Sequence, residues 1–447
     1  MAPLSRVVLL WALALPSCFR PTVLAPDRSL RLWRAEAAAP TGRRGNNLGK
    51  GSNNTTLIAG QAVQLALKNA PALQEARARQ ERARARVDEA SQLENPQLRI
   101  RDIELDGLAH AEPRLDLALR VPVPAPWTRD ARGERARLRL EEASAERDDL
   151  ERRVRAEVRK LYARLAMLDR RAALLKRTVD LCAKYRELAD RRVREGAATE
   201  LDASLPKLRH AEALDRQHRL RLARAQTLSR LRLLTGVRPD RRVTFRTASA
   251  DLDPDGSGAP DQQQLIRRAL TQRRDLRSAA ARVGVAEADA YIARAQRWPW
   301  LRFAEVGYNI RPEPDPLNFQ FYLAFDIPLL SWNRGAIAAR EAQLARRRVE
   351  ERAQILRAAQ EVSDAAARVR ETGAQLREAR RTLLPALEAG SKAMKQAVAH
   401  GVIDPLRATI VEWRRFRAQR RYLDTQLAHR EAVIDLEAAV GDAAGGD

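Results

Sequence analysis

The sequence contains one pattern twice, with the second copy about 205 residues after the first. We assign the first copy to 57–236, the second to 262–441 and a linker to 237–261, with a short tail at 442–447. Self-similarity over so long a period means that one structural unit, used twice, makes up the fold. The aligned pairs include Pro96 with Pro299, Leu98 with Leu301, Trp127 with Trp332, Gly196 with Gly401 and Gly236 with Gly441.

The composition favours long helices over an ordinary enzyme domain. The 447 residues include only 20 Gly and 22 Pro, and aromatic residues make up 4% where apolar residues make up 45%. The core must therefore be built from Ala, Leu and Val, which is typical of packed helices. A large cavity lined by aromatic side chains is not expected, so we predict that the protein is not an enzyme.

Each copy has the order helix, two strands, very long helix, turn and helix. The first long helix is expected at about 129–196. In both long helices the apolar residues are spaced alternately by four and three positions, which indicates a coiled-coil seam. Such a helix spans ~100 Å, so the opening helix (60–94) and the return helix must stack end to end beside it. We expect Pro385 to bend the second long helix. The seam positions are Val154, Val158, Leu161, Leu165, Leu168, Ala172, Leu175, Val179 and Cys182, then Ile355, Ala359, Val362, Ala366, Val369, Gly373 and Leu376.

Both long helices end in the same kind of tight turn. Gly196 supplies a left-handed residue, and Thr199 with Asp202 has the spacing of a capping box that starts the return helix. Gly401 and Asp404 repeat the arrangement, with a proline at the first helical position. The sequence therefore predicts helical hairpins at 194–203 and 399–408.

Between the helices lie strand pairs with one apolar face. Segments 115–123 and 319–329 alternate apolar and polar residues over about ten positions, the length of a tilted strand that crosses an outer membrane. The partner strands, near 97–106 and 300–310, alternate less cleanly. The alternative is a soluble hairpin packed under a helix. We expect these residues to face lipid: Leu115, Leu117, Leu119, Val121, Phe319, Phe321, Leu323, Phe325 and Ile327.

A membrane location for these strands demands an oligomer. An open sheet edge in lipid leaves backbone groups without partners, so the sheet must close. Four strands cannot close, since the smallest bacterial barrels have about eight. Several chains must therefore pool their strands, and the helical cylinder must be shared in the same way.

The N-terminus has the pattern of an export signal. Arg6 precedes a short apolar run, 7–15, that is too short to span a bilayer as a helix. A small residue precedes Cys18, which is similar to the acylation site of bacterial lipoproteins, although Pro16 is atypical there. We therefore assign 1–18 to a signal peptide with Cys18 as the lipidation candidate; simple cleavage nearby is the alternative. Residues 19–56 are polar and aperiodic and are predicted to be a disordered tether.

Four segments resemble one family of bacterial proteins. The segments 69–73 (NAPAL), 325–329 (FDIPL), 332–336 (WNRGA) and 383–385 (LLP), together with the paired tips, resemble the TolC family of outer-membrane efflux proteins. The heavy-metal cation branch, of the cobalt-zinc-cadmium type, is the most similar. The resemblance covers about 57–441 and depends on segment order and duplication more than on a single signature.

The resemblance implies a fold, an assembly and partners. It implies a homotrimer in which twelve strands form one barrel in the outer-membrane lipid and the helices form a periplasmic tunnel, a shared α-barrel. It also implies a passive duct without cofactors, docked on a periplasmic adaptor protein and an inner-membrane pump. Heavy-metal cations are one implied cargo; type I protein secretion or drug efflux is the alternative, because nothing in the tunnel sequence decides the cargo.

By the same resemblance, the two turns close the tunnel and meet the adaptor. This assigns the periplasmic tip and gate to Gly196, Thr199, Glu200, Asp202, Gly401, Asp404 and Arg407. Where some members carry an acidic ring, this chain has Arg407. We expect Asp202 and Arg407 to form salt bridges that hold the tip shut; the alternative is that both are solvated at a turn.

The strongly basic charge requires a second hypothesis. The formal net charge is +24, so a basic coiled-coil protein that binds nucleic acid must be considered. The signal, the apolar strand faces and the interleaving of Arg with Glu argue against it, and no nucleic-acid partner is expected. His210 and His218 lack carboxylates at ligand spacing, so no metal site is predicted. The segment 45–50 has neither the spacing nor the hydroxyl of a phosphate-binding loop.

Overall fold

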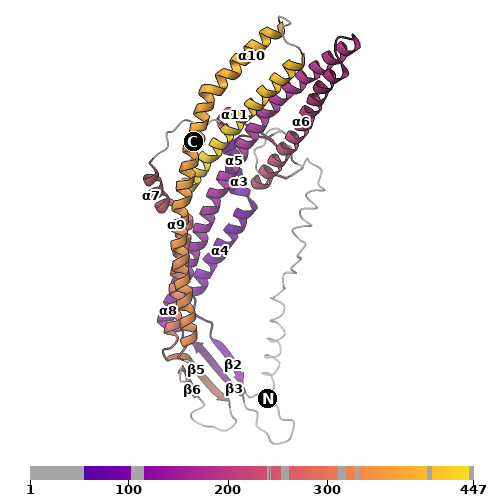
Figure 1. Ribbon diagram of the computed structural model, residues 1–447. Coiled ribbons are helices and arrows are strands. Elements are labelled where there is room, and N and C mark those ends of the chain that lie inside the picture. The colour runs from indigo at the N-terminus through magenta and orange to yellow at the C-terminus, as the bar shows by residue number, and fades with distance from the viewer. Residues whose placement is uncertain are drawn as a thin grey trace, which may run out of the picture. The chain divides into compact units, whose positions relative to one another are not determined.

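The computed structural model describes residues 55–101, 115–238, 241, 243–252, 261–310, 319–327, 332–399 and 405–441 (Figure 1). Cys18, most of the predicted tether, the tail, Gly401 and Asp404 lie outside these ranges. The chain divides into a unit formed by 1–53 and a unit formed by 54–447, and the second unit contains every element described below.

The elements follow the predicted order twice, so the duplication is confirmed. The first repeat contains α3 (Ala59–Asn69), α4 (Pro71–Ser91), β2 (Gln97–Arg101), β3 (Leu115–Pro122), α5 (Pro126–Arg194) and α6 (Glu200–Thr235). The second contains α7 (Gln262–Gln272), α8 (Arg274–Ala295), β5 (Trp300–Ile310), β6 (Phe319–Asp326), α9 (Arg334–Glu378), the π-helical segment η3 (Ala379–Leu383), α10 (Leu384–Ala399) and α11 (Pro405–Val440).

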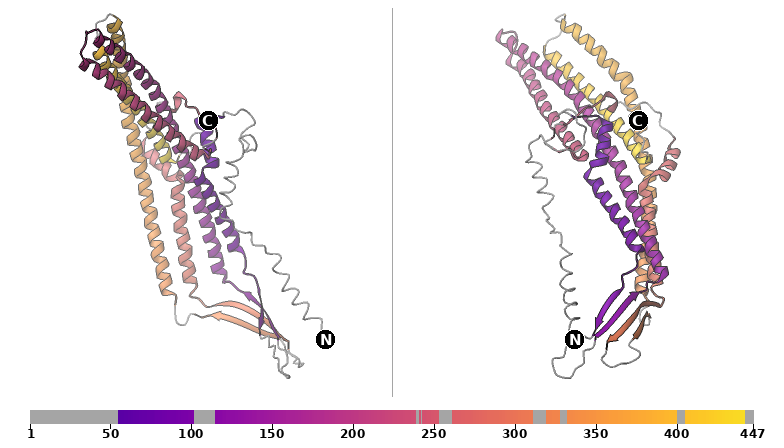
Figure 2. Two further views of the ribbon diagram at one scale, coloured as in Figure 1. Left: turned by 90° about the vertical axis from the view of Figure 1, so that its right-hand side faces the viewer. Right: turned by 180° about the vertical axis from the view of Figure 1, so that it is seen from behind.

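The helices lie side by side in a layer. Next to the sheet the order is α4, α5, α8, α9, as the left view of Figure 2 shows. Further from the sheet, α6 and α11 take the places of α4 and α8, and both contact α5. The end of α3 contacts α6, and α7 contacts α11, so each long helix is flanked by two shorter ones stacked end to end, as predicted.

The opening helix of each repeat is interrupted, which the sequence analysis did not predict. We expected one helix over 60–94, but α3 ends before Ala70, whose ψ is 126°. Pro71 disfavours helical geometry in the preceding residue and starts α4. The second repeat has the same break at Arg273, with ψ 123°, although no proline follows.

The long helices bury a matching series of positions. In α5, Val154, Val158, Tyr162 and Leu165 are buried, and the corresponding positions of α9 also belong to a core. Most of the predicted seam is confirmed, including Cys182, but Ala172 and Ile355 are exposed. Both errors have one cause: a strict seven-residue step drifts around a real helix, so the side that faces the neighbours changes along it. The buried α9 positions are Ala358, Val362, Ala366 and Val369.

The second long helix changes its winding before Pro385. A short π-helical segment, η3, separates α9 from α10 and ends at Leu383. Proline cannot donate the hydrogen bond that would continue a regular helix, and a π turn is one way to absorb that loss. We predicted a bend at Pro385; what the structure shows is a change of hydrogen-bond pattern in the residues just before it.

The linker between the repeats contains ordered structure. Strand β4 (Val243–Phe245) pairs in parallel with β1 (Thr55–Leu57), and a 3-10 turn, η2 (Ser249–Asp251), follows. Thr55 and Thr56 therefore belong to a strand, whereas we had assigned them to the tether. Burial of Leu57 and Phe245 against Tyr162 explains the pairing, because two three-residue strands have little stability alone.

Candidate functional site

The four strands form one antiparallel sheet at the end of the helical layer (Figure 1). Their order is β2, β3, β5, β6, so the central pairing joins a strand of the first repeat to a strand of the second. In that pairing Leu119 lies opposite Val306. Among the described strands, β2 and β6 each have a neighbour on one side only. The sheet is therefore a single element built by both repeats, with two open edges.

One face of the sheet is apolar and exposed. Leu98 is 68% exposed, Leu119 48%, Val306 43% and Phe321 76%. The register places these four residues in one row across β2, β3, β5 and β6. Leu117 is half-buried, and only the backbone of Leu115 is described. The other predicted membrane-facing residues are all exposed, Ile327 just beyond the end of β6: Val121, Phe319, Leu323, Phe325 and Ile327. An apolar patch of this kind marks a surface that binds lipid or protein.

The opposite face carries a charged cluster that sequence reasoning missed. Glu305 is 2% exposed, and Arg120 donates a hydrogen bond of 2.7 Å from Nε to its Oε2. Arg99 lies 3.6 Å from the same oxygen, and the Arg120 guanidinium lies 3.6 Å above the ring of Phe303. Strand alternation alone places these residues on the face opposite Leu119, so the signal was present in the sequence. The contact across β2, β3 and β5 becomes apparent only from the strand order.

The first tip has the predicted turn. Gly196 has φ +70°, and the Thr199 hydroxyl oxygen accepts a 3.3 Å hydrogen bond from the backbone N–H of Asp202. The Asp202 carboxylate in turn accepts from the Thr199 backbone N–H at 2.9 Å. This backbone hydrogen bond and, after it, a 2.7 Å hydrogen bond from the Thr199 hydroxyl to the carboxylate lower the pKa of Asp202. The two residues thus form the capping box of α6, which begins at Glu200. The second tip can be described only in part. Gly401 and Asp404 lie outside the described residues, and Arg407 is described only as part of the α11 backbone.

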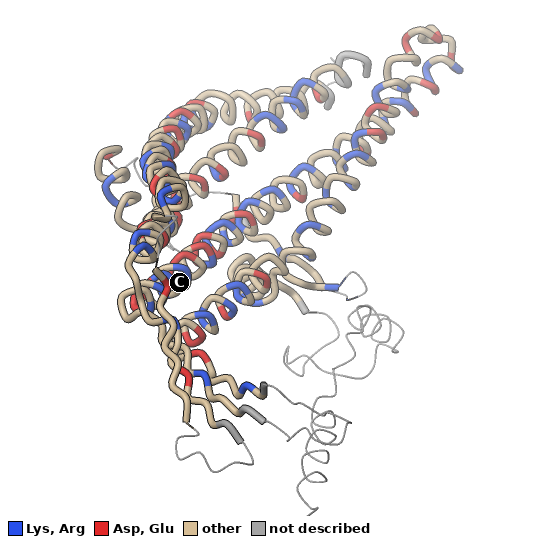
Figure 3. Tube along the Cα trace, turned by 90° about the horizontal axis from the view of Figure 1, so that it is seen from below, with Lys and Arg blue, Asp and Glu red and all other residues tan. Residues whose placement is uncertain are grey.

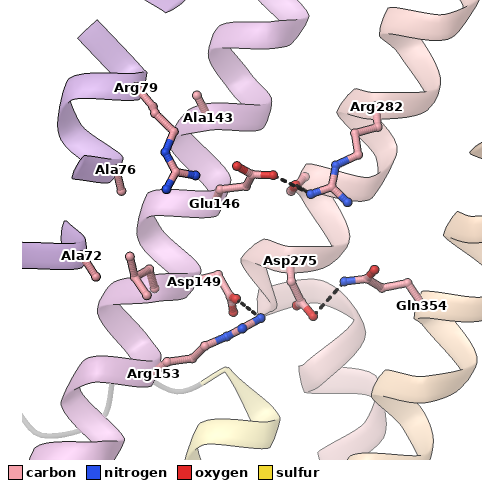
Figure 4. Close-up of a pocket in the computed structure, with 12 residues that line it drawn as sticks. Ala72, Ala76, Arg79, Ala143, Glu146, Asp149, Arg153, Asp275, Arg282 and Gln354 are labelled. Atoms are coloured by element: carbon pink, nitrogen blue, oxygen red, sulfur yellow. Dashed lines mark hydrogen bonds and ion pairs between the residues drawn. The ribbon is translucent and has the colours of Figure 1, made fainter. Parts of the chain in front are cut away.

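A hollow between α4, α5, α8 and α9 has a volume of about 390 Å³ (Figure 4). Its charged side chains pair with one another. Arg282 bonds to Glu146 at 2.5 Å, Arg153 to Asp149 at 2.6 Å, and Gln354 donates to Asp275 at 3.2 Å. Because these groups satisfy each other, the hollow has no convergent set of groups aimed at a ligand.

Within the described ranges, no three His, Cys, Asp or Glu side chains are grouped so that they could hold a metal ion. Over the same residues, every helix is too short or too polar to cross a bilayer. Basic and acidic residues are mixed along the helices (Figure 3). Among the described residues, the sheet at the end of the helical layer is the element that presents an exposed apolar face.

A layer of long helices joined to a sheet with an exposed apolar face is the arrangement expected of an outer-membrane channel protein. The model of the outer membrane efflux protein family matches residues 62–237 and 265–442, one match for each repeat and more than half of the chain. The chain belongs to this family, whose members are channels of the outer membrane and not enzymes. No curated protein sequence is significantly similar to it.

Solved structures share the fold. The channel protein CusC superposes with a TM-score of 0.71 at 18% identity, over 90% of this chain and 99% of CusC. The open state of the Neisseria gonorrhoeae outer-membrane channel MtrE gives 0.70 at 18% identity, over 86% and 88%. The Vibrio cholerae outer-membrane protein VceC gives 0.69 at 19%, over 86% and 96%. These chains match nearly their whole length, so both repeats and the sheet belong to the shared fold.

Proposed function

We propose that three copies of this chain form the outer-membrane channel of a tripartite efflux system. The observation that carries the proposal is the sheet: it has two open edges and one exposed apolar face. Pairing of β2 in one copy with β6 in the next satisfies both edges. Three copies then provide twelve strands, within the range of bacterial barrels, and bring the apolar faces outward to lipid. The helical layers join in the same way into a periplasmic tunnel.

The channel is a passive duct, and its tips contact the other components. Adaptor and pump are needed because nothing in the described part of the chain couples an energy source to transport. The periplasmic adaptor meets the hairpins that contain Gly196 and Gly401, and the inner-membrane pump supplies the energy. We propose that Asp202 and Arg407 hold the tip closed across neighbouring copies. Arg407→Ala is then expected to give a leakier channel, and unchanged single-channel conductance in a planar bilayer would contradict the salt bridge.

The cargo is set by the pump with which the channel works. The sequence resemblance to the heavy-metal branch supports heavy-metal cations, and CusC is among the structures that share the fold. Type I protein secretion and drug efflux are the alternatives. Deletion of the gene should lower the growth of its host on cobalt, zinc or cadmium and leave drug tolerance unchanged. The reverse result would assign the duct to drug efflux.

The assembly is tested on matched variants of adjacent residues in β6. Phe321 lies on the apolar face and Gln320 on the opposite face. Phe321→Glu places a charge against lipid and should abolish the outer-membrane species, whereas Gln320→Glu should leave it intact. The readout is membrane fractionation followed by the mass of the detergent-solubilised protein. A wild-type mass of one chain, or equal behaviour of the two variants, would contradict the shared barrel.

A further inference from the structure

The charged cluster on the polar face of the sheet has an excess of positive charge. Arg99 and Arg120 both approach Glu305, at 3.6 Å and 2.7 Å. The carboxylate is 1% exposed, whereas the side chains of Arg99 and Arg120 are 39% and 22% exposed. The guanidinium groups therefore cover the acid. What this face presents to its surroundings is a net positive charge, because the single negative group is the one that is hidden.

The neighbours of the cluster do not cancel this charge. Ala118 and Gly307 follow along β3 and β5 and have no polar side-chain atoms. Arg302 pairs with Asp326 at 3.6 Å, so these two charges offset each other. The register places Arg101 opposite Asp116, and their formal charges sum to zero. The net formal charge of the described strands is thus one positive charge, and it comes from the cluster.

We infer that Arg99, Arg120 and Glu305 set an anion preference inside the barrel. The inference rests on the proposed function, because the polar face becomes the lumen only when the apolar face meets lipid. The cluster then occurs once in each of three copies and forms a ring of guanidinium groups at one level of the strands. A ring of Arg along an aqueous pore attracts anions and repels small cations, so this ring favours an anionic cargo over the free metal cations that the family branch suggests.

Glu305 has a second part in this arrangement. Without it, Arg99 and Arg120 would repel each other across β2 and β3. The net positive charge of the cluster in each copy would double. The carboxylate thus holds the two guanidinium groups in place and moderates the field that they produce. The stacking of Arg120 over Phe303, with 3.6 Å to the ring centroid, also fixes the group at the sheet surface.

The reversal potential of single channels in a planar bilayer under a KCl gradient tests the inference. Glu305→Gln raises the charge of the cluster by one in each copy, and Arg99→Gln lowers it by one. Arg99 is the safer substitution, because the shorter contact between Arg120 and Glu305 remains. The double variant Arg120→Gln with Glu305→Gln removes the close pair but keeps the wild-type excess, so it controls for loss of the ion pair itself.

We expect the ratio of chloride to potassium permeability to be highest in Glu305→Gln and lowest in Arg99→Gln. Each should differ from wild type by roughly two-fold or more, and the double variant should resemble wild type. Channels that conduct but show the same ratio in all four proteins would overturn the inference and leave the duct in place. Absence of any channel from the wild-type protein would instead contradict the proposed function.

Discussion

The two repeats break their opening helices at the same place but stabilise the break differently. In the first repeat, Pro71 starts the second helix, and Asn69 donates to the Thr235 carbonyl oxygen at 3.4 Å. In the second, Arg273 is 4% exposed and donates to Asp275 at 2.8 Å and to Glu361 at 2.7 Å. One geometry is thus reached with proline in one copy and with a buried ion pair in the other.

The hydrophobic cores beside the two breaks also contain different kinds of side chain. Tyr162 is almost fully buried in the first repeat, and its hydroxyl donates to the Leu57 carbonyl oxygen at 3.0 Å. The matching position in α9 is Ala366, and the second core is made mainly of alanine and valine. The first repeat depends on large apolar side chains, whereas the second combines small ones with a charged contact. Duplicated units can therefore keep a backbone while exchanging the interactions that hold it.

The largest effect is expected for Tyr162→Ala. It removes an aromatic ring from the first core and should lower the stability of that repeat by about 3–5 kcal/mol. Hydrogen exchange measured by mass spectrometry reports on each repeat separately and should show faster exchange in α3 and α6 but not in α7. Tyr162→Phe is the control and should cost about 1 kcal/mol or less, because the Leu57 carbonyl also accepts from the Arg246 N–H. If exchange becomes equally faster in both repeats, the two cores do not contribute to stability independently.

Arg273→Ala should have the next largest effect and act on the second repeat. It leaves Asp275 buried without its main partner, at a cost of about 3 kcal/mol, the lower end for a broken buried pair. The double variant Arg273→Met with Asp275→Leu should recover most of this loss. If the double variant exchanges as fast as the single one, the ion pair itself, and not the burial of an unpaired Asp275, accounts for the loss.

The same ion pair predicts an acid sensitivity of the second repeat. Burial alone raises the pKa of Asp275, but the hydrogen bonds and charge of Arg273 outweigh it and hold the pKa below its usual value. The pair thus stabilises the fold above the unfolded pKa of an aspartate, about 3.9, and this contribution disappears as pH falls further. Exchange of α7 and α8 should rise on acidification more in the wild type than in the double variant. Parallel profiles would contradict this assignment.

Alanine substitutions at two glycines with left-handed backbone conformation distinguish the cost of backbone strain from the cost of a steric clash. Gly196 has φ +70° with no atom near the site of an added Cβ, whereas at Gly236, with φ +66°, that Cβ would lie 2.8 Å from the Cβ of Asn69. Gly196→Ala should cost about 1–2 kcal/mol, the penalty for a left-handed residue. Gly236→Ala should cost more, since α3 must also move. If the two variants lose the same stability, measured by hydrogen exchange in α6, then Asn69 moves away from the added Cβ at little cost.

Thr199→Ala should have the smallest effect. It removes the hydroxyl that accepts from the Asp202 N–H and should cost about 1 kcal/mol, confined to the first turn of α6. Thr199→Ser should behave as the wild type in the exchange of that turn. A change that spreads to α3 would mean that the tip is coupled to the core of the repeat.

Patterns that depend on local chemistry were readable in the sequence. The duplication, the ends of α5 and α6 and the exposed face of β3 and β6 follow from periodicity, capping residues and strand alternation. The break at Arg273 could not be read from the sequence, because no proline or glycine marks it and one of the ion pairs of Arg273 joins it to Glu361, 88 residues away. The pairing of β1 with β4 likewise depends on Tyr162 and not on either short strand.

The candidate site was predicted in part for the same reason. Alternation identified the apolar face through residues such as Leu119 and Phe321. It did not reveal that Glu305 is buried beneath Arg99 and Arg120, since that requires β3 of one repeat to lie beside β5 of the other. The separation of these two strands along the chain hides the contact.

The open edges of β2 and β6 also limit how long a newly made chain can exist alone. Among the described strands, each edge lies beside an apolar surface without a neighbouring strand, a combination that templates aggregation. In the proposed trimer, strand pairing between copies would compete with misassembly from the moment the sheet forms. We therefore expect the cell to bring the copies together quickly at the membrane or to shield the sheet until they meet.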